Sequence, residues 1–315
     1  MSARIAVIGC GQWGQNHVRT LSSLGALAAI SDNDPVRAEH LSNQYGVPQL
    51  SLEALLASDQ IDAATVALPP YLHGTVARQV LSSGKDVLIE KPIALDPLDA
   101  AETVELAKSS GQLLMVGHVL RFHPVYEALA QQVAEGRIGE LRHIVATRLG
   151  LGRFLGMDAV WDLAPHDLSM VLDLAGSHTV TMKSMRSTIL SNETDVADIR
   201  LTFDNGITAE IHVSRISPFR DRRLSVIGTE GMLTFDDLLP DGQKLAFYGH
   251  RVWAEGSQHA FHHADPVYLD VPPGLPLTRE MEHFIHCVET RSMPRTGAEE
   301  AALVVALLST ASPRA

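Results

Sequence analysis

A glycine-rich turn near the start of the chain constrains the fold more than any other feature. Gly9-Cys10-Gly11-Gln12-Trp13-Gly14 has the pattern G-x-G-x-x-G, directly after a short apolar run and at the start of a helical pattern. In this pattern the first glycine permits a tight turn, the second lets a pyrophosphate approach the backbone, and the third allows close packing of helix and strand. The N-terminus of the helix then offers free N–H groups to phosphates. The turn therefore predicts a dinucleotide-binding βαβ unit.

An acidic residue at the end of the second apolar run indicates which dinucleotide is bound. Asp32 follows Gly14 close to the ~20-residue spacing that such units use. A carboxylate at this place accepts hydrogen bonds from both ribose hydroxyls and repels a 2′-phosphate. The sequence therefore favours NAD over NADP.

The rest of the first 120 residues repeats the strand-then-helix pattern. Apolar runs with little alternation, separated by helices, are typical of a parallel sheet that is covered on both faces. The runs are Arg4–Ile8, Leu27–Ser31, Ala63–Leu68, Val87–Glu90 and Leu113–Gly117, and the helical patterns are Trp13–Leu24, Pro35–Tyr45, Leu72–Ser83 and Leu98–Ser110. Because parallel crossovers are right-handed, we predict a doubly wound Rossmann sheet, and an NAD-binding domain over residues 1–120.

After a helix at Pro124–Glu135 the pattern changes to longer strands. They are expected at Leu141–Leu149, Val180–Ser187, Val196–Phe203, Ile207–Ile216, Leu224–Ile227 and Met232–Phe235. Asp204-Asn205-Gly206 and Gly228-Thr229-Glu230-Gly231 have the composition of hairpin turns. Helices are expected at Pro165–Leu174 and twice near the end. We therefore predict a second, α+β domain over residues 121–315 with a mostly antiparallel open sheet. Its terminal helices are free to pack back on the first domain.

The composition excludes several classes of protein. The 315 residues carry a formal net charge of -12, which disfavours nucleic acid and anionic membrane as partners. No stretch approaches the ~20 apolar residues of a membrane span. The two cysteines fit no zinc or redox spacing, which is typical of a reducing compartment. We therefore expect a cytoplasmic protein with neither nucleic acid nor membrane as a partner.

Two further motifs carry residue types that can move protons. Glu90-Lys91-Pro92 follows the fourth strand, at the carboxyl edge where open α/β sheets bind ligands. Lys91 can act as a general acid or base or hydrogen-bond a substrate oxygen, and the turn allows a cis bond before Pro92. Asp162 and His166 are four residues apart at an expected helix start, where the carboxylate can orient the imidazole. The structural alternatives are a solvated lysine, a helix-capping aspartate and a buried neutral histidine.

The fifteen histidines suggest a metal, but their spacing does not support one. His283 and His286 are three residues apart, and His259, His262 and His263 cluster near Asp265. Neither group has a second well-spaced ligand pair of the kind found in zinc sites. We therefore predict that the protein has no metal site.

Taken together, these motifs resemble the Gfo/Idh/MocA oxidoreductases over essentially the whole chain. The resemblance rests on Gly9–Gly14, Asp32, Glu90-Lys91-Pro92, the Asp162/His166 pair and Ile227-Gly228-Thr229-Glu230-Gly231, in that order. Thr278–Leu308, including Pro294-Arg295-Thr296-Gly297, is similar to the family's closing helices. The resemblance implies a Rossmann domain followed by an α/β domain. The open sheet of that domain often forms the oligomer interface, so we expect a homodimer or homotetramer.

Two stretches resemble one branch of the family, the sugar-nucleotide 3-dehydrogenases. They are Gly11–Asn16 and Trp161–Asp167. The resemblance implies NAD-dependent oxidation of the C3 hydroxyl of UDP-N-acetylglucosamine or its uronic acid, before a transamination in lipid A or surface-polysaccharide synthesis. Lys91 and His166 match the catalytic pair and Asp162 the adjoining carboxylate. The expected cofactor contacts are Gly9, Gly11, Gln12, Trp13, Gly14, Asp32, Leu68, Pro69, His73, Glu90, Lys91, His118 and Trp161. Leu68-Pro69-Pro70-Tyr71-Leu72-His73 departs from the family's usual Thr-Pro start but keeps the following histidine.

A diphosphate substrate requires local positive charge, and two arginine-rich segments supply it. They are Gly136–Arg153 and Arg215–Arg223. Because a guanidinium binds phosphate in bidentate fashion, Arg148 and Arg153 are the candidates for the pyrophosphate. The alternative is arginines on exposed strand faces. The expected substrate contacts are Lys91, Arg121, Arg148, Arg153, Asp162 and His166.

Other functions compatible with the sequence come from different classes. One is a dehydrogenase of a free sugar or polyol such as inositol, on the same scaffold. A second is a non-catalytic NAD-binding regulator, against which the presence of Lys91, Asp162 and His166 together counts. A third is a metal-dependent hydrolase built on the histidines, which full activity after chelation would exclude.

Overall fold

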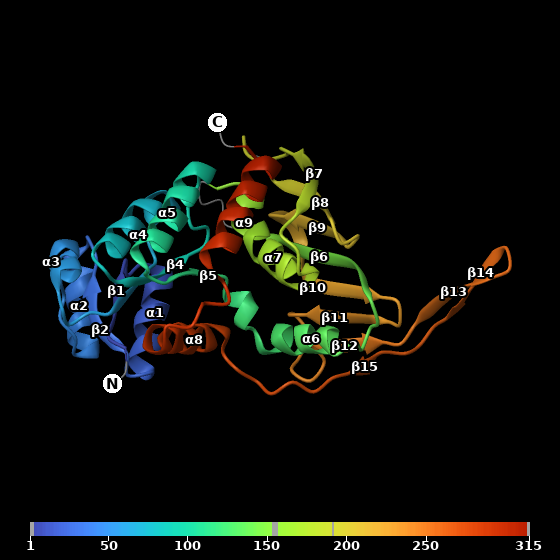
Figure 1. Cartoon of the computed structure of the whole chain (residues 1–315), viewed down its shortest axis with the longest axis horizontal. Helices are drawn as coiled ribbons and strands as arrows, with labels where there is room; N and C mark the ends of the chain where they lie inside the picture. Colours follow the sequence, from blue (N-terminus) through green and yellow to red (C-terminus); the bar gives the residue numbers. More distant parts are fainter. Residues whose placement is uncertain (1–2, 153–156, 191, 314–315) are drawn as a thin grey trace. The chain divides into compact units, whose positions relative to one another are not determined.

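A computed structural model describes residues 3–152, 157–190 and 192–313. The chain divides into two compact units (Figure 1). The first consists of Met1–Val119 and Pro276–Ser309, and the second of Leu120–Leu275 and Thr310–Ala315. The closing helices therefore group mainly with the first unit.

The first unit is built on a five-stranded parallel sheet in the order β2-β1-β3-β4-β5. Its strands are β1 (Ile5–Ile8), β2 (Leu27–Ser31), β3 (Ala63–Val66), β4 (Asp86–Glu90) and β5 (Leu114–Gly117). Every residue of β1, β3, β4 and β5 is buried, as expected for a sheet that is covered on both faces. The doubly wound fold predicted from the sequence is confirmed.

The helices of this unit are α1 (Gln12–Ser23), α2 (Pro35–Tyr45), α3 (Leu52–Ala57), α4 (His73–Ser82), α5 (Pro97–Ser110), α8 (Pro276–Thr290) and α9 (Ala298–Ala311), with a 3₁₀ turn at Pro70–Leu72. Local side chains cap the N-termini of α2, α3 and α5. The Asp34 side chain caps α2, and Gly46 ends that helix in the left-handed conformation. The sequence analysis missed α3. Its signal was Ser51, whose side chain accepts a hydrogen bond from Ala54 N.

The second unit contains an eight-stranded sheet in the order β15-β12-β11-β10-β6-β9-β8-β7. Only β6 and β9 pair in parallel, so the sheet is mostly antiparallel, as predicted. Its strands are β6 (Leu141–Leu151), β7 (Val180–Ser187), β8 (Val196–Phe203), β9 (Thr208–Ser214), β10 (Ile216–Gly228), β11 (Met232–Asp236), β12 (Leu245–Tyr248) and β15 (Val267–Tyr268). The helices α6 (Pro124–Ala134) and α7 (Ala159–Ala175) complete the unit, with a 3₁₀ turn at Val119–Phe122 leading into it.

The sequence analysis missed the strands after residue 244 and most of β10. Among them, β13 (Arg251–Glu255) and β14 (Gln258–His262) form a separate hairpin that extends away from the large sheet (Figure 1). Nearly every residue of the hairpin is exposed, so its sequence carries no alternation between buried and exposed positions. Hydrophobic periodicity, the main sequence signal for a strand, is therefore lacking there.

The start of α7 was predicted wrongly. The helix begins at Ala159 rather than Pro165, because the Asp158 side chain accepts a hydrogen bond from Trp161 N and caps it there. Pro165 therefore lies inside the helix, where its ring nitrogen cannot donate to the Trp161 carbonyl. As a result, Asp162 and His166 lie one turn apart within a continuous helix.

Candidate functional site

The carboxyl ends of the parallel strands bring the predicted cofactor residues of the first unit to one edge of the sheet. Gly9 follows β1, Asp32 follows β2, Leu68 lies beyond β3, and Glu90 and His118 lie at the ends of β4 and β5. In open α/β sheets this edge is where ligands bind. The backbone and a few side chains at this edge can thus position a ligand.

The geometry of the glycine turn fits a dinucleotide phosphate. A Cβ on Gly14 would lie 1.9 Å from Gly9 O, so residue 14 must be glycine for α1 to pack on the turn. Gly9 has a φ of +85°, and a Cβ there would lie 2.6 Å from Leu68 Cδ2. A Cβ on Gly11 would meet nothing within 4 Å, which leaves its backbone open to a ligand. No acidic side chain lies in the first turn of α1. The N-terminus of α1 can therefore receive a phosphate.

Two backbone N–H groups, one in the glycine turn and one just after β2, hold the carboxylate of Asp32. Its Oδ2 accepts a hydrogen bond from Cys10 N at 2.5 Å, and its Oδ1 accepts one from Asp34 N at 2.8 Å. Arg37 Nη1 lies 3.4 Å from Oδ2. Burial and the Asp32 charge raise the pKa of the Cys10 thiol to about 12, so Cys10 acts as a packing residue. The Asp32 carboxylate thus holds the glycine turn in place.

Glu90 is the centre of a buried hydrogen-bond cluster at the end of β4. Its Oε1 accepts from the indole Nε1 of Trp13 and lies 3.0 Å from His17 Nε2, while its Oε2 accepts from Lys91 N at 3.3 Å. Gly117 on the neighbouring strand leaves room for this carboxylate, since a Cβ there would lie 3.1 Å from Oε1. The peptide bond from Lys91 to Pro92 is cis. Glu90 therefore links the glycine turn to the backbone of Lys91.

His73 has a different position from the one expected of a cofactor contact. It is buried, with Nδ1 2.7 Å from Pro92 O and Nε2 2.8 Å from Leu68 O. Burial lowers the pKa of His73, although the two carbonyls favour its protonated form. Because backbone carbonyls engage both ring nitrogens, His73 holds the Leu68 and Pro92 loops together rather than facing a ligand. His118 is also buried, and its backbone N donates to Val116 O at 2.7 Å.

In the second unit, α7 carries the Asp162/His166 pair. Both residues are half-buried, and their spacing places them on one face of the helix. Trp161, which we expected near the cofactor, is buried, and its indole Nε1 donates to Ser312 O at 2.9 Å. Its indole therefore helps to pack the first turn of α7.

Two of the predicted substrate arginines are buried against α7. Arg148 on β6 makes a bidentate ion pair with Asp167, with both N–O distances 2.8 Å. Burial alone would lower the pKa of Arg148, but Asp167, Asp237 and Asp162 raise it. Arg121 donates to Ser169 O at 3.1 Å and pairs with Asp173 at 2.5 Å. These arginines anchor α7 in the structure, and their contact with a diphosphate stays a prediction. Arg153 lies outside the described residues.

Arginines of the Arg215–Arg223 segment lie beside Arg148 and are more accessible than it is. Arg222 on β10 stands directly opposite Arg148 on β6, an arrangement that is ordinarily unfavourable for like charges. Burial and then the charges of Arg148 and Arg220 lower the pKa of Arg222. The side chain of Arg222 is 41% exposed, and its one described carboxylate partner is Asp237 at 3.9 Å. This concentration of positive charge can attract an anion.

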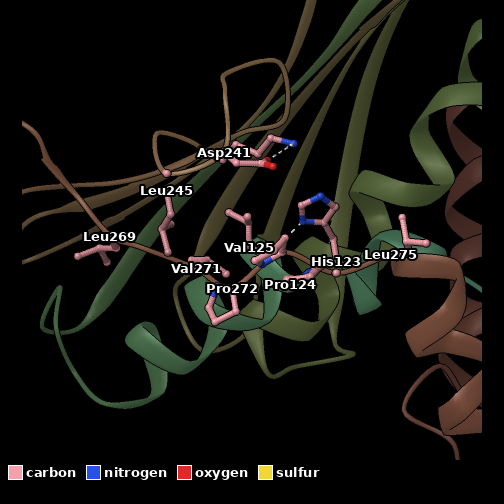
Figure 2. Close-up of a pocket in the computed structure, with 13 residues that line it drawn as sticks. His123, Pro124, Val125, Asp241, Leu245, Leu269, Val271, Pro272 and Leu275 are labelled. Atoms are coloured by element: carbon pink, nitrogen blue, oxygen red, sulfur yellow. Dashed lines mark hydrogen bonds and ion pairs between the residues drawn. The ribbon is translucent and has the colours of Figure 1, made fainter.

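A cavity of about 390 Å³ lies between the start of α6 and the segment that follows β15 (Figure 2). Its polar lining comes from His123, Asp241 and Lys244, and proline, leucine and valine side chains supply the rest. Burial lowers the pKa of His123, although Asp237, 3.6 Å from its Nε2, opposes this. Lys244 pairs with Asp241 at 3.6 Å. The sequence analysis found no signal for this cavity, because the lining residues come from separate loops.

Among the described residues, no group of three or more His, Cys, Asp or Glu side chains is arranged to hold a metal ion. His283, one of the candidates, instead accepts a hydrogen bond from Arg295 N at 3.0 Å. In the same part of the chain, no helix is both long and apolar enough to span a membrane.

Comparison with family models gives two matches that cover most of the chain. Residues 3–118 match the oxidoreductase family with an NAD-binding Rossmann fold. Residues 126–234 match the GFO/IDH/MocA C-terminal domain.

Individual relatives and structures agree with these matches. The UDP-N-acetylglucosamine 3-dehydrogenase of Acidithiobacillus ferrooxidans is 29% identical over 75% of this chain and 74% of its own length. The NAD-dependent scyllo-inositol 2-dehydrogenase of Bacillus subtilis is 26% identical over 92% of this chain and 87% of its own. A crystal structure of the Acidithiobacillus enzyme superposes with a TM-score of 0.86 over 99% of this chain and 97% of its own, at 24% identity. At that identity the structure supports the fold alone.

Proposed function

The chain belongs to the GFO/IDH/MocA family of oxidoreductases, and from this premise we propose that it oxidises the C3 hydroxyl of a UDP-N-acetylhexosamine with NAD. UDP-N-acetylglucosamine is the substrate that we favour. The product is a 3-keto sugar nucleotide, which is the form that a transaminase requires. The proposed site of action is the cytoplasm, and the 3-amino sugar then serves lipid A or surface-polysaccharide synthesis.

The likeness to the Acidithiobacillus UDP-N-acetylglucosamine 3-dehydrogenase over three quarters of both chains carries this proposal. The residues present agree with it. Lys91 stands at the ligand-binding edge of the parallel sheet, and Asp162 and His166 share one face of α7. An imidazole can accept the hydroxyl proton, a carboxylate can orient that imidazole and an ammonium can stabilise the developing oxyanion, so these groups can support an alcohol dehydrogenation without a metal.

Each of these groups has an assigned role in the proposed reaction. When NAD is bound, it accepts a hydride from C3. His166, oriented by Asp162, accepts the proton of the C3 hydroxyl as the C–O bond becomes a carbonyl. Lys91, in its ammonium form, stabilises the negative charge that develops on this oxygen. Gly9, Gly11 and Gly14 with the start of α1 hold the diphosphate of NAD, and Asp32 holds its ribose.

The substrate diphosphate requires a second set of cations, which the second unit supplies. Arg148 is buried against Asp167, so Arg220 and Arg222 beside it are the proposed contacts. Arg148 then holds β6 to α7 beside them through Asp167, and Arg153 remains a proposed contact from the sequence. Bidentate N–H donors suit the terminal oxygens of a diphosphate.

The second candidate function is oxidation of a free polyol such as inositol. It is favoured by the likeness to the Bacillus scyllo-inositol 2-dehydrogenase, which covers more of this chain at 26% identity. UDP-N-acetylglucosaminuronate is a further candidate within the favoured class, because Lys91, Asp162 and His166 serve either C6 substituent.

The substrate can be tested by following NAD reduction with UDP-N-acetylglucosamine, its uronic acid, free N-acetylglucosamine and inositols in parallel. A ketone trap keeps the reaction in the forward direction. We expect turnover with one of the two UDP-sugars and at least about 100-fold lower kcat/KM for free sugars, since the diphosphate contacts are lost. Faster turnover of an inositol would replace the proposal by the second candidate.

The open face of the eight-stranded sheet is the proposed contact between copies of the chain. Helix α7 packs on the other face, against β6, β8 and β9. The open face carries alternating polar side chains, including the pairs Arg200–Glu210 at 3.6 Å and His212–Asp198 at 2.6 Å. Sedimentation analysis of wild type and Arg200→Glu tests this. Dimers or tetramers of wild type that dissociate in the variant are expected, and a monomeric wild type would refute it.

A further inference from the structure

Glu280 is a buried carboxyl group that the proposed reaction does not use. It lies on α8, is 0% exposed, and neither of its carboxyl oxygens has a hydrogen-bond partner among the described residues. Burying a polar group without a partner costs free energy, and most such groups in proteins are satisfied. The presence of this side chain therefore requires an explanation.

The ring of His17 on α1 contains another buried polar atom without a hydrogen-bond partner among the described residues. The ring is 0% exposed, and its Nε2 lies 3.0 Å from Glu90 Oε1. An ionised carboxylate only accepts, so Nε2 carries the hydrogen of this bond. In the neutral ring, Nδ1 is then an acceptor, and no described residue donates to it.

The two unsatisfied groups are complementary, and both lie near Glu90. Helix α8 packs against α1 within the first unit. Burial, and then the charge of Glu90, raise the pKa of Glu280 well above its ordinary value. Burial favours the neutral carboxyl form, which has an O–H to donate. Glu90 accepts hydrogen bonds from the Trp13 indole and from Lys91 N, and its Oε1 also lies within hydrogen-bond distance of His17 Nε2.

We propose that Glu280 is a positioning residue that donates the hydrogen bond missing at His17 Nδ1 through one bridging water, and so fixes the His17 tautomer that holds Glu90. The proton on Glu280 keeps Nδ1 as an acceptor and Nε2–H directed at Glu90. Glu90 in turn holds the Trp13 indole and the Lys91 backbone. Only this last step, which links the cluster to Lys91, rests on the proposed function.

The tautomer of His17 can be measured directly in the protein without cofactor. Nitrogen NMR of protein labelled at its histidine rings distinguishes a protonated from an unprotonated ring nitrogen, and His17→Asn assigns the signal. In wild type and in Glu280→Gln, whose amide still donates, we expect a proton on Nε2 and none on Nδ1. In Glu280→Met, which has no donor, we expect mixed tautomers.

Cofactor affinity provides the second readout. Glu280→Met loses one neutral hydrogen bond of the series that runs from Glu280 through His17 to Glu90, so its Kd for NAD should rise about threefold to tenfold. Glu280→Gln keeps the bond, so its Kd for NAD should be that of wild type. Glu282→Met, on the exposed side of the same helix, is the matched control. An unaltered His17 spectrum and an unaltered Kd in Glu280→Met would overturn the proposal.

If Glu280→Met does not fold, the proposal can still be tested by comparing the pH dependence of the stability of wild type and Glu280→Gln. A carboxyl whose folded pKa is raised keeps its proton above the pH at which the unfolded chain releases it. Wild type therefore loses stability relative to Glu280→Gln as pH rises from about 4.5, with one extra proton released on unfolding. Release of the same number of protons on unfolding of both proteins would overturn the proposal. Because neither the NMR nor the Kd needs a sugar, failure of UDP-N-acetylglucosamine as substrate leaves this test intact.

Discussion

Glu90 in the first unit and Arg148 in the second are both buried charged residues close to a proposed reacting group. Glu90 is surrounded by neutral donors, namely the Trp13 indole, His17 and the Lys91 backbone N–H. Arg148 is instead neutralised by a full opposite charge, the bidentate carboxylate of Asp167. The hydrogen bonds of Glu90 therefore hold the glycine turn and the Lys91 backbone together, whereas the ion pair of Arg148 holds a helix to the sheet. The first unit thus arranges the backbone at its edge, and the second gives α7 a rigid support.

The strongest test of this comparison removes the proposed reacting group of each unit in turn. Lys91→Met and His166→Asn should each lower kcat by about 10²–10⁴-fold, because each removes a proton-transfer or charge-stabilising group, while both variants still bind NAD. Steady-state NADH formation and calorimetry measure the two quantities. Lys183→Met and His259→Asn, at exposed positions, are matched controls. Near-normal turnover in either site variant would remove that residue from the mechanism.

Breaking the ion pair of the second unit should cost stability. Asp167→Asn leaves the buried Arg148 without its partner, so the free energy of unfolding should fall by about 3–5 kcal/mol. The double variant Arg148→Met/Asp167→Leu should recover most of this loss. Urea denaturation measures both, and Glu210→Gln, from an exposed pair, should cost less than about 1 kcal/mol. A similar loss in the double variant would mean that packing rather than charge holds α7.

Substitution of Asp32 shows whether a carboxylate that already binds the backbone also selects NAD over NADP. Asp32→Ala should raise the Kd for NAD by about 10–100-fold, since hydrogen bonds to a charged group are lost. It should tighten NADP binding, because Arg37 then faces the 2′-phosphate without its neighbouring carboxylate. Titrations of the intrinsic fluorescence with both cofactors measure the ratio. An unchanged preference for NAD would assign Asp32 to the turn alone.

Two glycines of the turn should differ in what an added methyl group disturbs, with the smallest effects expected here. Gly14→Ala places a Cβ 1.9 Å from Gly9 O and should cost about 1–3 kcal/mol of stability. Gly11→Ala meets nothing within 4 Å, so its Tm should be that of wild type. Its added methyl group should still raise the Kd for NAD about tenfold, the equivalent of one hydrogen bond. Equal loss of Tm in both variants would contradict the assigned roles.

The same comparison explains how much the sequence could predict. The features of the first unit are encoded locally: a glycine turn, an acidic residue at a fixed spacing, and Glu90-Lys91-Pro92 directly after a strand. The hairpin turns of the second unit, such as Asp204-Asn205-Gly206, are local as well, and both are present. Such signals need no knowledge of distant contacts, which is why they sufficed for the fold.

What the sequence could not reveal depends on contacts between distant residues. Arg148 reads as an exposed strand arginine until Asp167 is placed against it. Glu280 lies in an amphipathic helix among charged residues, and its burial follows only from the packing of α8 on α1. Pro165 suggested a helix start, but the cap at Asp158 set the start two turns earlier. In each case a tertiary contact or a competing cap overrides the local pattern.

The transfer of hydride from C3 can be measured most directly with UDP-N-acetylglucosamine that carries deuterium at C3. Enzyme, NAD and this substrate are mixed, and the reduced cofactor is analysed by mass spectrometry and proton NMR. We expect one deuterium at C4 of the nicotinamide and a slower rate than with unlabelled substrate. Reduced cofactor without deuterium, with the label still on the sugar, would contradict it.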